Sequence, residues 1–172
     1  DQESNILIEG SDLTIVANSF SCLQAKRVIE QLERENYSIE LIDLRILNPL
    51  KYDKLVNSVK KTGRLLSIDG GWTTCGVAGE IIAGITERID PSSLKTRPVR
   101  LTLTDAPAPT SKPLENEYYL SEEKIINTIR PAHIRSENNM VQYSQTENPM
   151  ALHTLQNPRK TVPRSTAHIV TN

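Results

Sequence analysis

The sequence predicts an α/β domain in which helices cover both faces of a mostly parallel sheet. Short apolar segments alternate along the chain with longer segments whose apolar residues recur at helical spacing. Strands that alternate with helices of this length are typical of parallel sheets buried on both faces. The chain has 172 residues, of which 37% are hydrophobic and 24% charged, which suits one domain with a real core and a tail.

The first strand and helix of this alternation lie near the amino terminus. Leu13–Ser19 is a short apolar run, which predicts a strand. Residues 22–35 carry charges between apolar positions, which predicts an amphipathic helix with Ser21 as its N-cap. The apolar stripe that we expect to face the sheet consists of Leu23, Val28, Ile29 and Leu32.

The same alternation then repeats. A strand over Ser38–Arg45 precedes a helix over 52–62, a strand over Arg64–Ile68 precedes a helix over 79–89, and a strand over Val99–Thr104 precedes a last helix over 121–130. We expect Gly63 to end one helix in the left-handed conformation and Ser121 to cap the last one. The Pro-rich segment 105–113 is expected to be an extended crossing.

One strand-like segment does not fit the alternation. Asn5–Gly10 reaches the next strand through only Ser11 and Asp12. This connection is too short for a parallel crossover, so we expect an antiparallel edge strand.

The composition changes after Arg130, and this change sets the expected domain boundary. Residues 131–172 are rich in Asn, Ser, Thr, Gln and Pro, with isolated apolar residues. We therefore assign residues 1–130 to the domain and 131–172 to a polar tail or linker that is ordered only by docking. The chain also begins with Asp rather than Met, which suggests a processed product or a piece of a longer polypeptide.

Charge and cysteine usage exclude several classes of function. Twenty Lys and Arg against 21 Asp and Glu give a formal net charge of −1, which argues against nucleic acid or an anionic membrane as a partner. No apolar run approaches the roughly 20 residues that span a bilayer, and no signal pattern is present, so we expect a soluble intracellular protein. Cys22 and Cys75 lack metal-site spacing and are expected to be reduced, partly buried thiols.

The segment IDGGWTTCGVAGEI, residues 68–81, is a glycine-rich turn from a strand to a helix. Such turns hold phosphate in many α/β proteins, but these glycines match neither GxGxxG nor the P-loop pattern. The alternative is that Gly76 and Gly79 allow close packing while Trp72 covers a surface. We favour this packing role over a small-molecule site.

Candidate catalytic groups are sparse in the predicted core. His133, His153 and His168 all lie in the polar tail, and the carboxylates Asp69 and Glu80 at the glycine turn are the best of the acids. Cys75 is near a helix N-terminus but has no histidine partner in the core, which favours an inert thiol. We therefore assign no catalytic, cofactor-binding or metal-binding residue.

Two stretches carry a resemblance to a known family: IDLRILNPL, residues 42–50, and KKTGRLLSIDGGW, residues 60–72. With the order of the other segments, residues 5–130 resemble the C-terminal domain of the transketolase superfamily. The resemblance is closest to the β subunit of the thiamine-diphosphate-dependent 2-oxo acid dehydrogenases, such as pyruvate dehydrogenase. It implies a three-layer α/β/α sandwich whose five-stranded sheet has one antiparallel edge strand.

The resemblance also implies a function for the parent enzyme, which decarboxylates a 2-oxo acid and acylates lipoamide. In that family thiamine diphosphate and magnesium lie between two other domains, so neither is expected to bind this fragment, which should be inactive alone. Its implied partners are other domains and subunits of the dehydrogenase, in an oligomer, and the lipoyl acyltransferase core. The implied location is the cytoplasm, or the mitochondrial matrix in a eukaryote.

Site residues follow from the same resemblance. It implies a subunit interface at the glycine turn, formed by Trp72, Gly76, Ala78 and Gly79, and a place for Thr110 near the substrate channel. Asp69 stands where relatives usually have Glu, and GVAGE replaces their usual GVGAE. Two other hypotheses remain: a stand-alone binding or scaffold module with the same fold, and a flavodoxin-like nucleotide binder.

Overall fold

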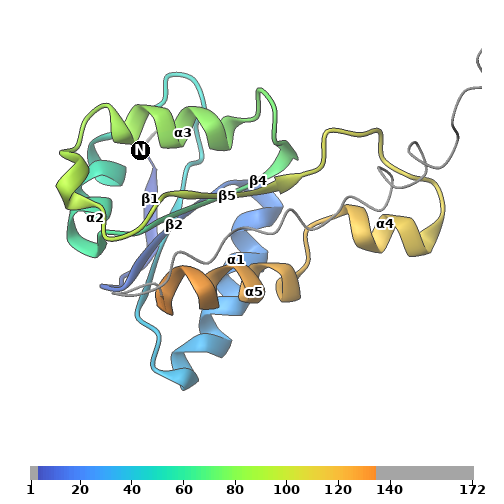
Figure 1. The fold of residues 1–172 in the computed structure, drawn as a ribbon, viewed down its shortest axis with the longest axis horizontal. Helices are drawn as coiled ribbons and strands as arrows, with labels where there is room; N and C mark the ends of the chain where they lie inside the picture. Colours follow the sequence, from blue (N-terminus) through green and yellow to red (C-terminus); the bar gives the residue numbers. More distant parts are fainter. Residues whose placement is uncertain (1–3, 135–172) are drawn as a thin grey trace, which may run out of the picture. The chain divides into compact units, whose positions relative to one another are not determined.

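A computed structural model of the chain describes residues 4–134, which form a five-stranded sheet with helices on both faces (Figure 1). The strands are β1 (Asn5–Ile8), β2 (Leu13–Ala17), β3 (Ile39–Asp43), β4 (Leu65–Trp72) and β5 (Val99–Leu103). The helices are α1 (Ser19–Leu32), α2 (Asp53–Thr62), α3 (Val77–Thr86), α4 (Lys112–Tyr118) and α5 (Glu122–Ile134), with short 3-10 turns η1 (Glu33–Glu35) and η2 (Pro91–Ser93).

The sheet has the strand order β1-β3-β2-β4-β5. β2, β3, β4 and β5 pair in parallel, while β1 pairs with β3 antiparallel at the edge. The expected antiparallel edge strand is therefore confirmed. Gly10 permits the short passage from β1 to β2, because a Cβ at this position would lie 2.3 Å from the carbonyl carbon of Ile39.

The two faces of the sheet carry separate apolar clusters, which confirms the predicted three-layer sandwich. On one face, α1 and α5 pack against the sheet through residues such as Ile29 and Ile125. On the other face, α2 and α3 pack through residues such as Leu55 and Ile81. Figure 1 shows α2 and α3 on one side of the strands and α1 and α5 on the other.

The start and the buried face of α1 differ from the sequence prediction. The helix begins at Ser19 with Asn18 as its N-cap residue, so Ser21 lies inside the first turn and is not the cap. Leu23 is 45% exposed, whereas the smaller Cys22 and Ala25 are buried. The prediction was wrong here because it weighted the larger apolar side chain, although Cys22 and Ala25 continue the face of Ile29 at helical spacing.

Two further boundaries depart from the prediction. β4 continues past Ile68 to Trp72, so most of the first half of the glycine turn is strand. Segment 105–113 is not wholly an extended crossing, since α4 begins at Lys112 with Pro113 in its first turn. A proline is tolerated there because the first N–H groups of a helix have no intrahelical partner.

Capping at two other helix ends agrees with the prediction. Gly63 has a φ of 74° and ends α2, and the Ser121 hydroxyl accepts a hydrogen bond from the Lys124 N–H at 3.2 Å at the start of α5. α5 continues to Ile134, past the expected domain boundary at residue 130. Residues 135–172 of the expected tail lie outside the described residues. Within residues 4–134, no helix is long and apolar enough to cross a membrane.

We predict that Ile29→Ala lowers the free energy of unfolding by about 2–5 kcal/mol, because Ile29 is fully buried between α1 and the sheet. Leu23→Ala on the same helix is the matched control and should change the free energy by less than about 1 kcal/mol, since Leu23 is half exposed. Urea unfolding of both variants measures the difference. Equal losses would show that the assigned buried face of α1 is wrong.

Candidate functional site: the glycine turn after β4

The carboxylate of Asp69 organises the glycine turn. Asp69 is 7% exposed, its Oδ1 accepts a hydrogen bond from the Gly71 N–H at 3.1 Å, and its Oδ2 accepts one from the Val77 N–H at 3.1 Å. Val77 is the first residue of α3, so the carboxylate lies at the helix N-terminus, where negative charge is favourable. The chain's own carboxylate therefore holds the place that a bound phosphate would take.

Gly76 is required by the tight path of the turn. A Cβ at this position would lie 2.1 Å from the Trp72 carbonyl oxygen and 3.2 Å from Asp69 Oδ2. A Cβ at Gly79 would meet only Nη1 of the Arg100 side chain, at 3.4 Å. Of the two glycines assigned to close packing, Gly76 alone is forced to be glycine, and its close neighbours belong to its own turn.

Hydrogen bonds also fasten the turn to the end of β5. The Thr74 N–H and hydroxyl donate to the two carboxylate oxygens of Asp105, at 3.0 and 2.5 Å, and the Thr73 N–H donates to the Leu103 carbonyl at 3.1 Å. The hydrogen bonds from Thr74 lower the pKa of Asp105 below its ordinary value. The turn is thus held between β4, β5 and α3.

Trp72 ends β4 on the surface, where it belongs to a small aromatic cluster. Its side chain is 53% exposed, and its Nε1–H donates to the Tyr118 hydroxyl at 2.9 Å. That hydroxyl donates in turn to the Ala106 carbonyl at 2.7 Å, and the Tyr118 and Tyr119 rings meet edge to face with centroids 5.2 Å apart. We call Trp72, Tyr118 and Tyr119 the aromatic surface. Its hydrogen bonds tie α4 to the end of the sheet.

The predicted interface residues occupy three different environments. Trp72 is exposed, Gly76 is partly exposed in the turn, and Gly79 is partly exposed in the first turn of α3. Ala78 is fully buried within the chain, so its side chain cannot reach a partner. Thr110 is exposed in the connection between β5 and α4. The interface prediction therefore depends on Trp72, Gly76 and Gly79.

The tyrosines of the aromatic surface were missed from the sequence. Tyr118 and Tyr119 follow a segment read as extended, so nothing placed them near Trp72. A helix-start signal was present nonetheless, because Ser111 precedes Lys112-Pro113 and Glu115 follows in the first turn.

The candidate catalytic groups do not form a catalytic pair. Both oxygens of Asp69 accept backbone hydrogen bonds, while Glu80 is exposed and accepts one from the Tyr52 hydroxyl at 3.1 Å. Among residues 4–134, no three His, Cys, Asp or Glu side chains gather as a metal site. His133 belongs to the last turn of α5, and His153 and His168 lie outside the described residues.

The two cysteines differ more than the sequence suggested. Cys22 is buried, and burial, reinforced by Asp43, raises the pKa of its thiol to about 11. Cys75 is exposed in the turn, in a left-handed conformation with a φ of 59°, so the expectation that it is partly buried was wrong. The Cys22 thiol therefore stays protonated at neutral pH.

The turn does not fit the diphosphate of a thiamine cofactor. The Val77 N–H at the start of α3, which would face a phosphate, already donates to Asp69, and the carboxylate would repel a second anion. The geometry supports close packing within the chain at this turn.

Residues 2–125 match the family model described as transketolase, C-terminal domain. The chain belongs to this family. The pyruvate dehydrogenase E1 component subunit beta of Rickettsia bellii is 35% identical over 129 residues, which are 74% of this chain and 39% of that protein. The mitochondrial counterpart from Ascaris suum is 34% identical over 128 residues, 74% of this chain and 36% of that protein. This transketolase C-terminal domain thus spans less than half the length of either relative.

Solved structures agree on the fold. A split-gene transketolase, an inactive β4 tetramer, has a TM-score of 0.61 at 23% identity, covering 76% of this chain and 42% of that chain. The 2-oxoglutarate:ferredoxin oxidoreductase of Magnetococcus marinus has a TM-score of 0.51 at 11% identity, covering 76% of this chain and 19% of that chain. At these identities the likeness shows the fold of the transketolase C-terminal domain and nothing about its ligands.

We predict that Gly76→Ala lowers the free energy of unfolding by about 1–3 kcal/mol, because the new methyl group would overlap the Trp72 carbonyl. Gly79→Ala is the matched control and should be neutral or stabilising by up to about 1 kcal/mol, since it adds a better helix former in open space. Thermal unfolding of the two variants compares them. A Gly76→Ala protein as stable as Gly79→Ala would contradict the close approach.

Proposed function

We propose that this chain is the subunit-association domain of a thiamine-diphosphate-dependent 2-oxo acid dehydrogenase β subunit. The observation that carries the proposal is an exposed Trp72, held in one orientation at the end of β4 in a domain whose relatives are subunits of pyruvate dehydrogenase. In the parent enzyme, decarboxylation of the 2-oxo acid and acyl transfer to lipoamide would be carried out by residues outside this domain.

The physical case for association rests on the rigidity of Trp72. Large aromatic side chains dominate the energetics of many protein interfaces when they become desolvated at the centre. Trp72 is the chain's single tryptophan, and its hydrogen bond to Tyr118 already restricts its rotamers. Little side-chain entropy would then be lost on docking, which favours binding.

The proposed partners are the other domains and subunits of the dehydrogenase, including the lipoyl acyltransferase core. Gly79, in the first turn of α3, is partly exposed and has only the end of the Arg100 side chain near its Cβ position, so a partner backbone could approach closely there. Thiamine diphosphate and magnesium would bind elsewhere in the assembly. We propose that Thr110, in the exposed connection before α4, lies near the substrate channel of the assembled enzyme. The cytoplasm or the mitochondrial matrix is the proposed location.

The coding sequence upstream of the codon for Asp1 tests the proposed parent enzyme. We predict that it encodes a pyrimidine-binding domain of about 180 residues, a typical domain size. A start codon immediately before Asp1 would contradict the dehydrogenase subunit and support a stand-alone module.

Substitution of Trp72 tests the association surface. We predict that the full chain self-associates with increasing concentration and that Trp72→Ala raises the dissociation constant by about thirtyfold or more, the effect of losing a hot-spot residue. Sedimentation equilibrium measures the association, and tryptophan emission of the unsubstituted chain should shift to shorter wavelength as it proceeds.

The control for this experiment is Leu47→Ala. Leu47 is 47% exposed on the connection after β3. Its substitution by Ala therefore removes exposed apolar surface, as Trp72→Ala does, but away from the proposed interface. An unchanged dissociation constant in Trp72→Ala, or an equal change in Leu47→Ala, would overturn the assignment of Trp72 to the interface. Thermal unfolding should show that Trp72→Ala remains folded, because Tyr118 keeps its hydrogen bond to Ala106.

A further inference from the structure

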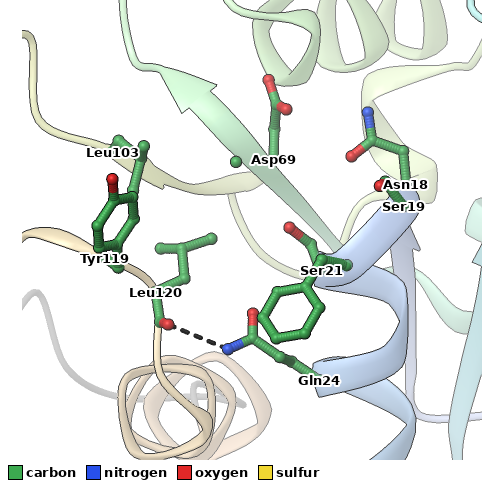
Figure 2. Close-up of a pocket in the computed structure, with 10 residues that line it drawn as sticks. Asn18, Ser19, Ser21, Gln24, Asp69, Leu103, Tyr119 and Leu120 are labelled. Carbon is green, nitrogen blue, oxygen red and sulfur yellow. Dashed lines mark hydrogen bonds between the residues drawn. The ribbon is translucent and has the colours of Figure 1, made fainter. Parts of the chain in front are cut away.

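A cavity of about 360 Å³ lies beside the first turns of α1. Its lining comes from three parts of the chain: the start of α1, the ends of β4 and β5, and the connection from α4 to α5. Figure 2 shows the polar side chains of Ser21 and Gln24 on one side and Leu103, Tyr119 and Leu120 on the other. This volume is within the range of small-molecule sites.

The position of the cavity in the sheet is one where α/β proteins bind ligands. β2 and β4 are neighbours, and the helices that follow them, α1 and α3, pack on opposite faces of the sheet. The connections that leave the carboxyl ends of two such strands run in opposite directions, which leaves a crevice at the topological switch point. The cavity lies there, between the residues after β2 and those at the end of β4.

Two nearly buried polar side chains line the cavity, and each presents one oxygen that has no hydrogen-bond partner among the described residues. Ser21 is 5% exposed and Gln24 is 8% exposed, and both line the cavity from one face of α1. Gln24 Nε2–H donates to the Leu120 carbonyl at 3.0 Å, which turns the amide oxygen toward the cavity. None of the residues that the structure describes hydrogen-bonds this amide oxygen or the Ser21 hydroxyl. Neither oxygen is among the fully buried unpaired atoms of the described residues, so both are open to the cavity, where water or a ligand can hydrogen-bond them.

The lining favours an uncharged ligand. It contains no Lys, Arg or His, and its single carboxylate, Asp69, is occupied by the N–H groups of Gly71 and Val77. A cation would lie beside the positive end of the α1 dipole. An anion, although that dipole favours it, would find no basic side chain and would lie near the Asp69 carboxylate. The opposite wall of Leu103, Tyr119 and Leu120 offers apolar and aromatic surface to a flat ligand.

We propose that this cavity binds a small, uncharged, planar aromatic amide. The amide N–H of the ligand donates to Gln24 Oε1, the Ser21 hydroxyl donates to the ligand carbonyl, and the ring lies against Leu120 and Tyr119. A ligand that lacked either group would leave one protein group unpaired, which makes the site selective. This site uses α1 and the α4–α5 connection, so it does not depend on the proposed subunit role.

Three probes of similar shape test the proposal on the full 172-residue chain: benzamide, benzoate and benzylamine. Each probe is titrated into the protein, and binding is followed by the NMR signals of the backbone amides. Benzamide should bind and shift the signals of Ser21, Gln24 and Leu120. Benzoate and benzylammonium, which carry a charge on the same ring, should bind at least about tenfold more weakly. Equal or tighter binding of a charged probe, or no benzamide binding up to about 10 mM, would overturn the proposal.

Variants separate the proposed hydrogen bonds from general aromatic binding. Ser21→Ala and Gln24→Leu should each raise the benzamide dissociation constant about two- to tenfold, the effect of one lost hydrogen bond. Ser21→Ala tests this most cleanly, because alanine is favourable in a helix and the Ser21 hydroxyl has no described partner to lose. Leu23→Ala is the control, since Leu23 is exposed on α1 and does not line the cavity. Unchanged binding by Ser21→Ala would reject the site.

Discussion

The backbone conformation at the carboxyl edge of the sheet depends on the hydrogen bonds that one carboxylate, that of Asp69, accepts. Asp69 accepts the N–H groups of Gly71 and Val77 and thereby fixes both the bend after β4 and the start of α3. Its burial would be unfavourable without these partners, because an unpaired buried charge is strongly destabilising. In the same turn Gly76 passes so close to the Trp72 carbonyl that a Cβ would lie 2.1 Å from its oxygen.

Asp69 fills a place that other α/β proteins leave open for an anionic ligand. A strand-to-helix turn with free N–H groups is an anion site in many enzymes, whereas here the chain supplies its own anion. Trp72 ends β4 just before the turn, and its indole N–H donates a hydrogen bond to the Tyr118 hydroxyl at the end of α4, which in turn donates to the Ala106 carbonyl. A rigid, exposed aromatic side chain suits contact with another protein, and the matched relatives are enzyme subunits more than twice as long as the part they share with this chain.

The aromatic surface and the cavity are adjacent and are both formed in part by residues 118–120, at the end of α4 and the start of the connection to α5. Tyr119 belongs to both, and the connection from α4 to α5 carries Leu120, whose carbonyl orients the Gln24 amide. The position of α4 therefore affects both the exposed tryptophan and the polar groups of the cavity. The covalent continuity of residues 118–120 couples them, because a shift of Tyr118 would move the next two residues as well.

The order of strands and helices could be predicted from the sequence because it follows from local patterns. Alternating apolar segments gave the parallel layers, and the two-residue connection at Ser11 and Asp12 required β1 to be antiparallel. The sequence also marked Trp72 and the glycine turn as unusual. It could not show that Asp69 bonds to Val77, that Ala78 is buried or that Tyr118 meets Trp72, since these contacts depend on how separate elements pack.

The sequence by itself thus determined the fold class, the antiparallel edge strand and the family, because periodicity, connection length and short motifs are local properties of the chain. Tertiary structure alone decided which face of α1 is buried and which of its polar side chains line the cavity. Ser21 was read as a cap but lies in the first turn of α1, facing a cavity that β4, β5 and the α4–α5 connection complete. Such an environment is formed by segments as far apart in the sequence as Asn18 and Leu120, so no local pattern encodes it.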